Sequence, residues 1–142
     1  MRFLIDTDWV IHFLNGKPGV VDNVQRLEPE GIGISIVSLA EVYEVIFTSR
    51  HHEPDEQHFR NFLTGVTVVN LDEEVTRVFA RARGRLRRSG KLIADFDLLI
   101  GATALRYNLT LLSNNRRLRA NRKFAHPLGL EYAGHDARCY IA

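Results

Sequence analysis

The chain has 142 residues and a mass of 16.2 kDa, a length typical of one domain. Leucine, isoleucine, valine and phenylalanine account for 46 residues, about a third of the chain, which excludes an intrinsically disordered protein. Nineteen basic and seventeen acidic residues leave a formal net charge of +2, so the total charge does not indicate a nucleic-acid-binding protein.

The apolar segments are too short for a membrane protein. No apolar run approaches the roughly 18 residues of a membrane helix, and Asp6 stands where a signal peptide would continue its apolar stretch. Cys139 is the one cysteine of the sequence, so it has no internal disulfide partner, and it belongs to no CxxC motif. We therefore expect a chain without membrane segments, whose folded domain begins at the N-terminus and which is located in the reducing cytoplasm.

Short apolar runs alternate with segments of helical periodicity along the chain. In chain order we expect a strand at 2–5, helices at 9–14 and 20–27, a strand at 31–36, a helix from Ser38, a helical turn or two at 59–63, a strand at 66–71, helices at 72–89 and 95–107, a strand at 109–112, and an edge strand in the tail after 131. This alternation predicts an α/β fold with a central, mostly parallel β-sheet of four to five strands, flanked by helices on both faces.

Four polar residues are expected at helix starts. Ser38 and Glu41 have the spacing of a capping box, in which the serine caps the helix. Asp8 and Asp95 are expected to cap the first and last helices, because carboxylates there accept backbone N–H groups and favour the helix dipole. Glu41 could have a capping role, a catalytic role or both.

Three acids from distant parts of the chain are expected at one edge of the sheet. Asp6 ends the first strand, Glu41 follows the second strand, and Asp97 begins the last helix. Functional side chains of open parallel sheets gather outside the carboxyl ends of the strands. Carboxylates that meet there repel one another unless a cation lies between them, and Mg²⁺ prefers such oxygen ligands. The sequence therefore predicts a magnesium site.

The residues around these acids resemble the motifs of PIN-domain ribonucleases, and most closely the toxin subunit of VapBC-type bacterial toxin–antitoxin pairs. The motifs are Leu4-Ile5-Asp6-Thr7-Asp8, Ser38-Leu39-Ala40-Glu41, Asp97-Leu98-Leu99-Ile100-Gly101-Ala102-Thr103-Ala104-Leu105 and Leu111-Leu112-Ser113-Asn114-Asn115. The resemblance covers residues 1–132 and implies that residues 1–142 form a single PIN-like nuclease domain. It also implies an endoribonuclease that uses Mg²⁺, or Mn²⁺ as a substitute, forms a homodimer and is inhibited by an antitoxin protein.

The resemblance also implies roles for individual residues. Asp6, Glu41 and Asp97 match the catalytic acids that bind the metal, and Asn115 falls on a fourth catalytic position that is often aspartate. A neutral amide ligates a metal only through its carbonyl oxygen, so the number of metal ions in the site, one or two, stays open. Asn115 could instead orient a water molecule or a phosphate oxygen. Thr7 and Ser113 match hydroxyl positions that hold the carboxylates in place. The implied reaction is RNA hydrolysis by metal-activated water, without a histidine or lysine base.

Basic residues cluster in two segments, 77–91 and 116–123. The second segment directly follows the last motif, and we expect its basic residues to bind RNA: Arg116, Arg117, Arg119, Arg122 and Lys123. The segment 77–91 contains a row of arginines at helical spacing, and no acid lies within this row: Arg77, Arg81, Arg85 and Arg88. A solvated helix face and a contact with RNA phosphates both remain open for this row. The histidines at 51, 52 and 58 match no ligand spacing and are interpreted as surface residues.

Two other functions are compatible with parts of the sequence. A PIN-fold module that binds RNA or a partner with weak or no cleavage is favoured by Asn115. A phosphatase of the haloacid-dehalogenase type is suggested by Asp6-Thr7-Asp8 after an apolar strand. That class requires a late acidic pair after a strand, whereas Asp95 and Asp97 begin a helix that precedes one.

Overall fold

The computed structural model describes residues 1–114 and the backbone of residues 139–141. The strands are β1 (Phe3–Ile5), β2 (Ile32–Ser35), β3 (Thr67–Val69), β4 (Thr110–Ser113) and β5 (Cys139–Ile141). The helices are α1 (Thr7–Leu14), α2 (Pro18–Leu27), α3 (Ile36–Thr48), α4 (His52–Leu63), α5 (Glu73–Arg88) and α6 (Asp95–Arg106), with a short 3₁₀ helix at Glu28–Glu30. None of the described helices combines the length and apolar character needed to cross a bilayer.

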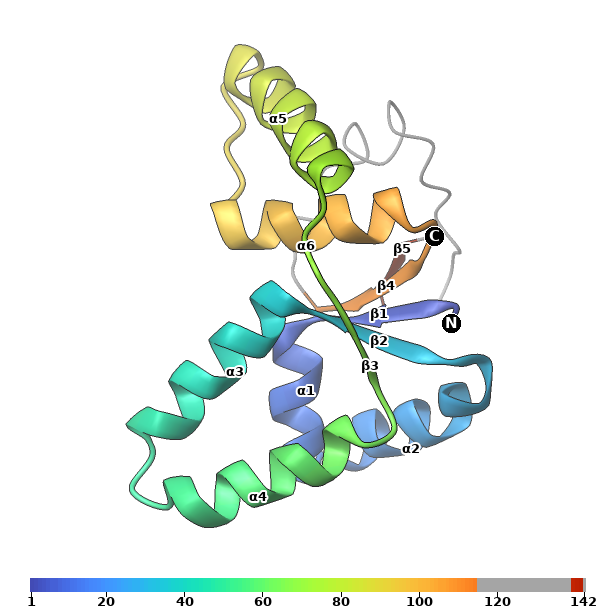
Figure 1. Cartoon of the computed structure of the whole chain (residues 1–142), viewed down its shortest axis with the longest axis vertical. Helices are drawn as coiled ribbons and strands as arrows, with labels where there is room; N and C mark the ends of the chain where they lie inside the picture. Colours follow the sequence, from blue (N-terminus) through green and yellow to red (C-terminus); the bar gives the residue numbers. More distant parts are fainter. Residues whose placement is uncertain (115–138, 142) are drawn as a thin grey trace.

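The strands form one sheet in the order β3-β2-β1-β4-β5. The first four are parallel, and β5 pairs antiparallel with β4 at the edge. The predicted α/β class, the mostly parallel sheet and the edge strand in the tail are confirmed. Because β1 lies between β2 and β4, the residues that follow these three strands meet at one edge of the sheet (Figure 1).

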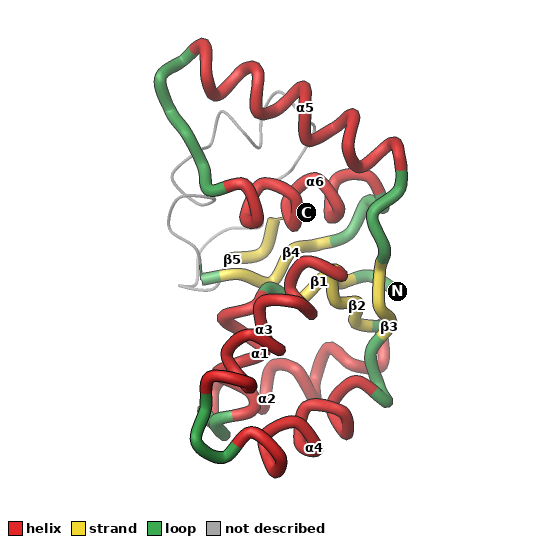
Figure 2. The backbone as a smooth tube through the Cα atoms, turned by 60° about the vertical axis from the view of Figure 1, so that its left-hand side comes forward, coloured by secondary structure: helices red, strands yellow, loops and turns green. Residues whose placement is uncertain are grey.

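Side chains of β1 and β4 alternate between two apolar layers, as the pleat requires. In β1, Leu4 packs with α5 and α6, whereas Phe3 and Ile5 pack with α1, α2 and α3. Figure 2 shows α5 and α6 on one side of the sheet and α1 to α4 on the other. Both faces are therefore covered, which explains why the parallel strands read as continuous apolar runs in the sequence.

Helix α3 begins earlier than the sequence predicts. The expected capping box of Ser38 and Glu41 is wrong, because Ser35 is the N-cap and its side chain accepts the N–H of Val37 at 3.2 Å. Ser38 lies in the first turn and is fully buried. The early start ends the second strand at Ser35 instead of residue 36 and leaves the Glu41 carboxylate without a capping role.

Three further predictions about helix starts are corrected. The helical turn or two expected at 59–63 is a full helix, α4, which begins within the polar histidine-rich stretch. Asp6 caps α1 in place of Asp8. Ala94 is the N-cap of α6 and provides no side-chain bond, while Asp95 pairs with Arg83 of α5 at 2.6 Å. The predicted long helix is confirmed as α5, capped by Asp72 and followed by Gly90 at a φ of 69°.

Candidate functional site

Four carboxylates from three helices and their caps line one open pocket of about 290 Å³. Asp6 directly follows β1, Glu41 lies in α3, and Asp97 lies in the first turn of α6. The complete lining is Asp6, Thr7, Asp8, Ile11, Glu41 and Asp97. The structure thus brings together the three acids and the threonine that the sequence singles out. It adds Asp8 and Ile11, which lie one turn apart on the same side of α1.

Hydroxyl and amide groups hold two of these carboxylates in place. Asp6 accepts hydrogen bonds from the Thr7 N–H at 2.7 Å and from the Ser113 hydroxyl at 2.5 Å. The Thr7 hydroxyl donates to Oε1 of Glu41 at 2.7 Å and so joins α1 to α3. Because Ser113 is the last residue of β4, these bonds connect the pocket to the rigid sheet. Thr7 and Ser113 thus each contact an acid that the resemblance names.

Asp8 was not selected from the sequence as a site residue. Its carboxylate accepts the N–H of Trp9 at 2.8 Å and the N–H of Asn114, after β4, at 3.0 Å. Burial raises its pKa, the two N–H groups lower it, His12 lowers it further, and the charge of Asp97 raises it. The sequence signal for Asp8 is its position two residues after Asp6, which also suits a helix cap.

Asp6 is 4% exposed and is the most strongly perturbed acid described in the chain. Its pKa is raised to about 7, mainly by burial, with smaller contributions from the charges of Asp8 and Asp97, while the hydrogen bonds from Ser113 and Thr7 oppose the shift. A buried carboxylate among like charges favours its neutral form unless a cation compensates. A carboxyl with such a pKa is also typical of functional sites.

The pocket suits a hard divalent cation. Its polar lining consists of four carboxylates and a hydroxyl, the oxygen ligands that Mg²⁺ and Mn²⁺ prefer. A water takes about 30 Å³ of liquid volume, so the pocket also has room for water molecules around an ion. Within residues 1–114, however, no group of three or more His, Cys, Asp or Glu is arranged as a ready-made metal site.

Several predicted site residues lie outside the described part of the chain. These are Asn115 and the expected RNA-binding residues Arg116, Arg117, Arg119, Arg122 and Lys123. The three histidines at 51, 52 and 58 are exposed, as expected of surface residues.

The chain is similar to known proteins over most of its length. Residues 3–123 match the PIN domain family. The ribonuclease VapC1 of Methanocaldococcus jannaschii is 31% identical over 117 residues, which cover 82% of this chain and 77% of that protein. The ribonuclease VapC2 of Rickettsia felis is 27% identical over 117 residues, or 81% of this chain and 87% of that protein.

A solved structure has a similar fold. The crystal structure of VapBC2 from Rickettsia felis bound to a DNA fragment from their promoter contains a chain that superposes with a TM-score of 0.79 at 25% identity. The superposition covers 86% of this chain and 94% of that chain.

Proposed function

The chain belongs to the PIN domain family as a VapC-type toxin endoribonuclease, and we propose that Asp6, Glu41 and Asp97 hold the divalent metal ion with which it cleaves RNA. The observation that carries this proposal is the shared pocket, into which three distant segments bring carboxylates. A bound divalent ion supplies Lewis-acid chemistry, since it polarises a phosphate oxygen and lowers the pKa of water. Membership of this family excludes the haloacid-dehalogenase alternative.

The residues of the chain position this chemistry. Thr7 orients Glu41 through its hydroxyl and Asp6 through its N–H, so one residue aligns two acids. Ser113 holds the other oxygen of Asp6. We propose Asn115 as the fourth catalytic position and the basic residues at 116–123 as RNA contacts, as the family resemblance implies. The homodimer stays a prediction.

We expect cleavage of RNA by the purified protein to stop in EDTA and to return when Mg²⁺ or Mn²⁺ is added in excess. The reason is that the carboxylates alone repel a phosphodiester and provide no electrophile. The measurement is the initial rate on a fluorescent RNA under each condition. Equal rates with and without EDTA would contradict a metal-dependent reaction, and the absence of turnover in all conditions would support a binding module instead.

An apolar groove beside the pocket suits the antitoxin. It runs between α1, α3 and α4 and is lined by Ile11, Leu14, Asn15, Val42, Val45, Ile46, Ser49, Asp55 and His58. Ile11 lines both the groove and the carboxylate pocket. We propose that the antitoxin lays an apolar segment into this groove and extends a basic side chain toward Asp6 and Asp97, in the place of the cation.

Expression of the wild-type protein in a bacterium is expected to arrest growth, and co-expression of its antitoxin to relieve the arrest. Val45 lines the groove and is 47% exposed, so Val45→Glu is expected to keep toxicity but to weaken the rescue, because the carboxylate loses water against an apolar partner. Val68→Glu is the matched control, since Val68 is 37% exposed and lies on β3, outside the groove. Full rescue of the Val45→Glu variant by the antitoxin would show that the antitoxin binds outside the groove.

A further inference from the structure

The carboxylate pocket cannot attract RNA by itself. Asp6, Asp8, Glu41 and Asp97 line it, and the phosphates of an RNA strand are repelled by these charges. Affinity for RNA comes mainly from basic side chains that neutralise phosphates. A nuclease with this pocket therefore needs a positive surface close to it, over which the strand continues.

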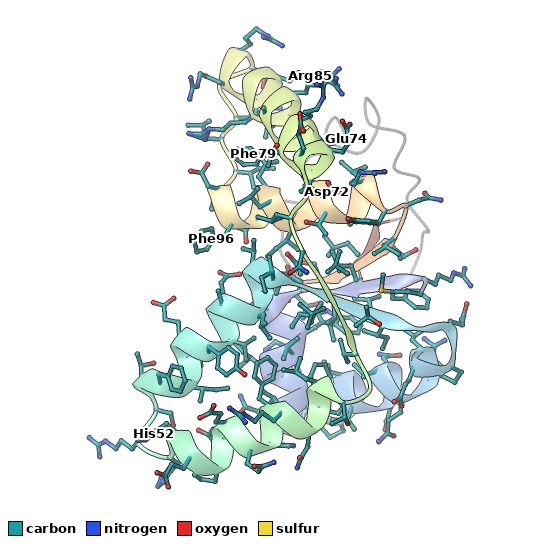
Figure 3. All side chains as sticks on the ribbon, viewed as in Figure 1. His52, Asp72, Glu74, Phe79, Arg85 and Phe96 are labelled. Carbon is teal, nitrogen blue, oxygen red and sulfur yellow. The ribbon has the colours of Figure 1, made fainter. Side chains whose placement is uncertain are left out.

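Helix α5 and the loop after it carry such a charge. Between residues 75 and 94 there are six arginines and one lysine and no acidic residue. The rest of the chain contains twelve basic and seventeen acidic residues, so it is net negative. The acids of α5 are confined to its beginning, where Glu74 lies, whereas Arg85 lies near its other end (Figure 3).

The basic side chains of α5 are directed away from the core. Val75, Ala82 and Leu86 are the buried residues of this helix and belong to its apolar side. Arg81, Arg85 and Arg88 are exposed, follow one another at helical spacing, and form no ion pair with any residue between 1 and 114. Arg77, the first arginine of the row, pairs with Glu74 at 3.6 Å.

The second half of α5 is tied to the start of α6. Arg83 pairs with Asp95 at 2.6 Å, and Asp95 lies two residues before Asp97 in the first turn of α6. The apolar side of α5 packs on α6. We propose that the row Arg81, Arg85 and Arg88 is a surface that binds the phosphate backbone of the RNA substrate outside the pocket.

The side chains favour RNA over an acidic protein partner. Guanidinium groups bind phosphate oxygens in a bidentate manner, and six of the seven basic residues are arginine. Arg87 is exposed on another side of the same helix, so positive charge is not confined to one face that an acidic protein surface would match. This distribution suits a uniformly charged strand. The inference rests on the proposed function, because it takes RNA as the substrate.

The test is a binding experiment in EDTA, in which no cleavage is needed. Affinity of the full chain for a short fluorescein-labelled RNA is measured by fluorescence anisotropy over a range of salt concentrations. The triple variant Arg81→Gln, Arg85→Gln, Arg88→Gln is compared with Lys17→Gln, Arg50→Gln, Arg60→Gln, which removes the same charge from exposed positions elsewhere. Circular dichroism and gel filtration check the fold and the oligomeric state of both.

We expect the α5 variant to bind RNA about tenfold more weakly or worse at moderate salt. The slope of log K against log salt should fall by about 2, since each contact with single-stranded RNA contributes roughly 0.7. The control should bind within about twofold of wild type. Equal affinity and slope for the α5 variant, or loss of antitoxin binding with RNA binding intact, would overturn the inference. Wild-type protein that binds RNA through α5 but never cleaves it would refute the proposed function alone.

Discussion

The rate of RNA cleavage is expected to fall at least about a hundredfold when Asp97 is replaced by asparagine. Asp97 lies half-buried in the first turn of α6 and lines the pocket with Asp6, Asp8 and Glu41. The amide keeps the size of the side chain but removes the charge that attracts a divalent ion. Loss of a group that merely supports a metal ligand lowers metal affinity or activity about 10- to 100-fold, so loss of the ligand itself should lower them at least as much.

The matched control for this prediction is Glu44→Gln. Glu44 is an exposed carboxylate one turn after Glu41 on α3 and does not line the pocket. The measurement is kcat/KM on a fluorescent RNA with Mg²⁺ in excess, together with a metal titration of each variant. Glu44→Gln should cleave at the wild-type rate. A kcat/KM for Asp97→Asn within a few-fold of wild type would show that Asp97 is not a ligand of the metal.

Replacing Asp6 with asparagine is expected to stabilise the metal-free protein at alkaline pH, although it should abolish cleavage. The folded-state pKa of Asp6 is raised to about 7, mainly by burial, from an ordinary value of 3.8. The folded protein therefore binds a proton that the unfolded chain has released, and stability is lost as the pH rises from about 4 to about 7. An amide resembles the neutral acid: its oxygen accepts from Thr7 and its nitrogen can donate to Ser113.

The size of this effect follows from the shift in pKa. A pKa raised from 3.8 to about 7 corresponds to about 4 kcal/mol in the free energy of unfolding, as an upper bound. Urea denaturation in EDTA at about pH 5 and about pH 8 should show a larger advantage of Asp6→Asn at the higher pH. Mg²⁺ at about ten times its Kd should add about 1.4 kcal/mol to the wild type at pH 8 and less to the variant. A variant less stable than wild type at both pH values would contradict the assigned charge state.

Local patterns determined the elements of the fold. The apolar runs of β1 and β4 are buried on both faces of the sheet, so a mostly parallel sheet of four to five strands could be predicted without coordinates, although the order of the strands could not. The errors occur where two local signals compete. Ser35 and Ser38 can each cap α3, and only the packing of the second strand decides that Ser35 does so. The histidine-rich start of α4 lacks an apolar stripe, and its helix is stabilised by the burial of Phe59 later in the segment.

The acids of the site follow from the same patterns and from the family resemblance. A strand that ends in Asp6, a helix that carries Glu41 and a helix that begins before Asp97 are visible as residue types at fixed distances along the chain. Parallel strands place their carboxyl ends at one edge, which explains why these acids were expected to meet. The pocket that they line agrees with this expectation.

Three properties of the site depended on tertiary structure. Asp8 lines the pocket because the N–H of Asn114, more than a hundred residues away, fixes its carboxylate. The raised pKa of Asp6 results mainly from the burial of its side chain, which cannot be deduced from spacing along the chain. The groove next to Ile11 exists only because α1, α3 and α4 pack with a gap between them. Residue type and periodicity determine local conformation, whereas desolvation, charge proximity and cavities arise from contacts between distant segments.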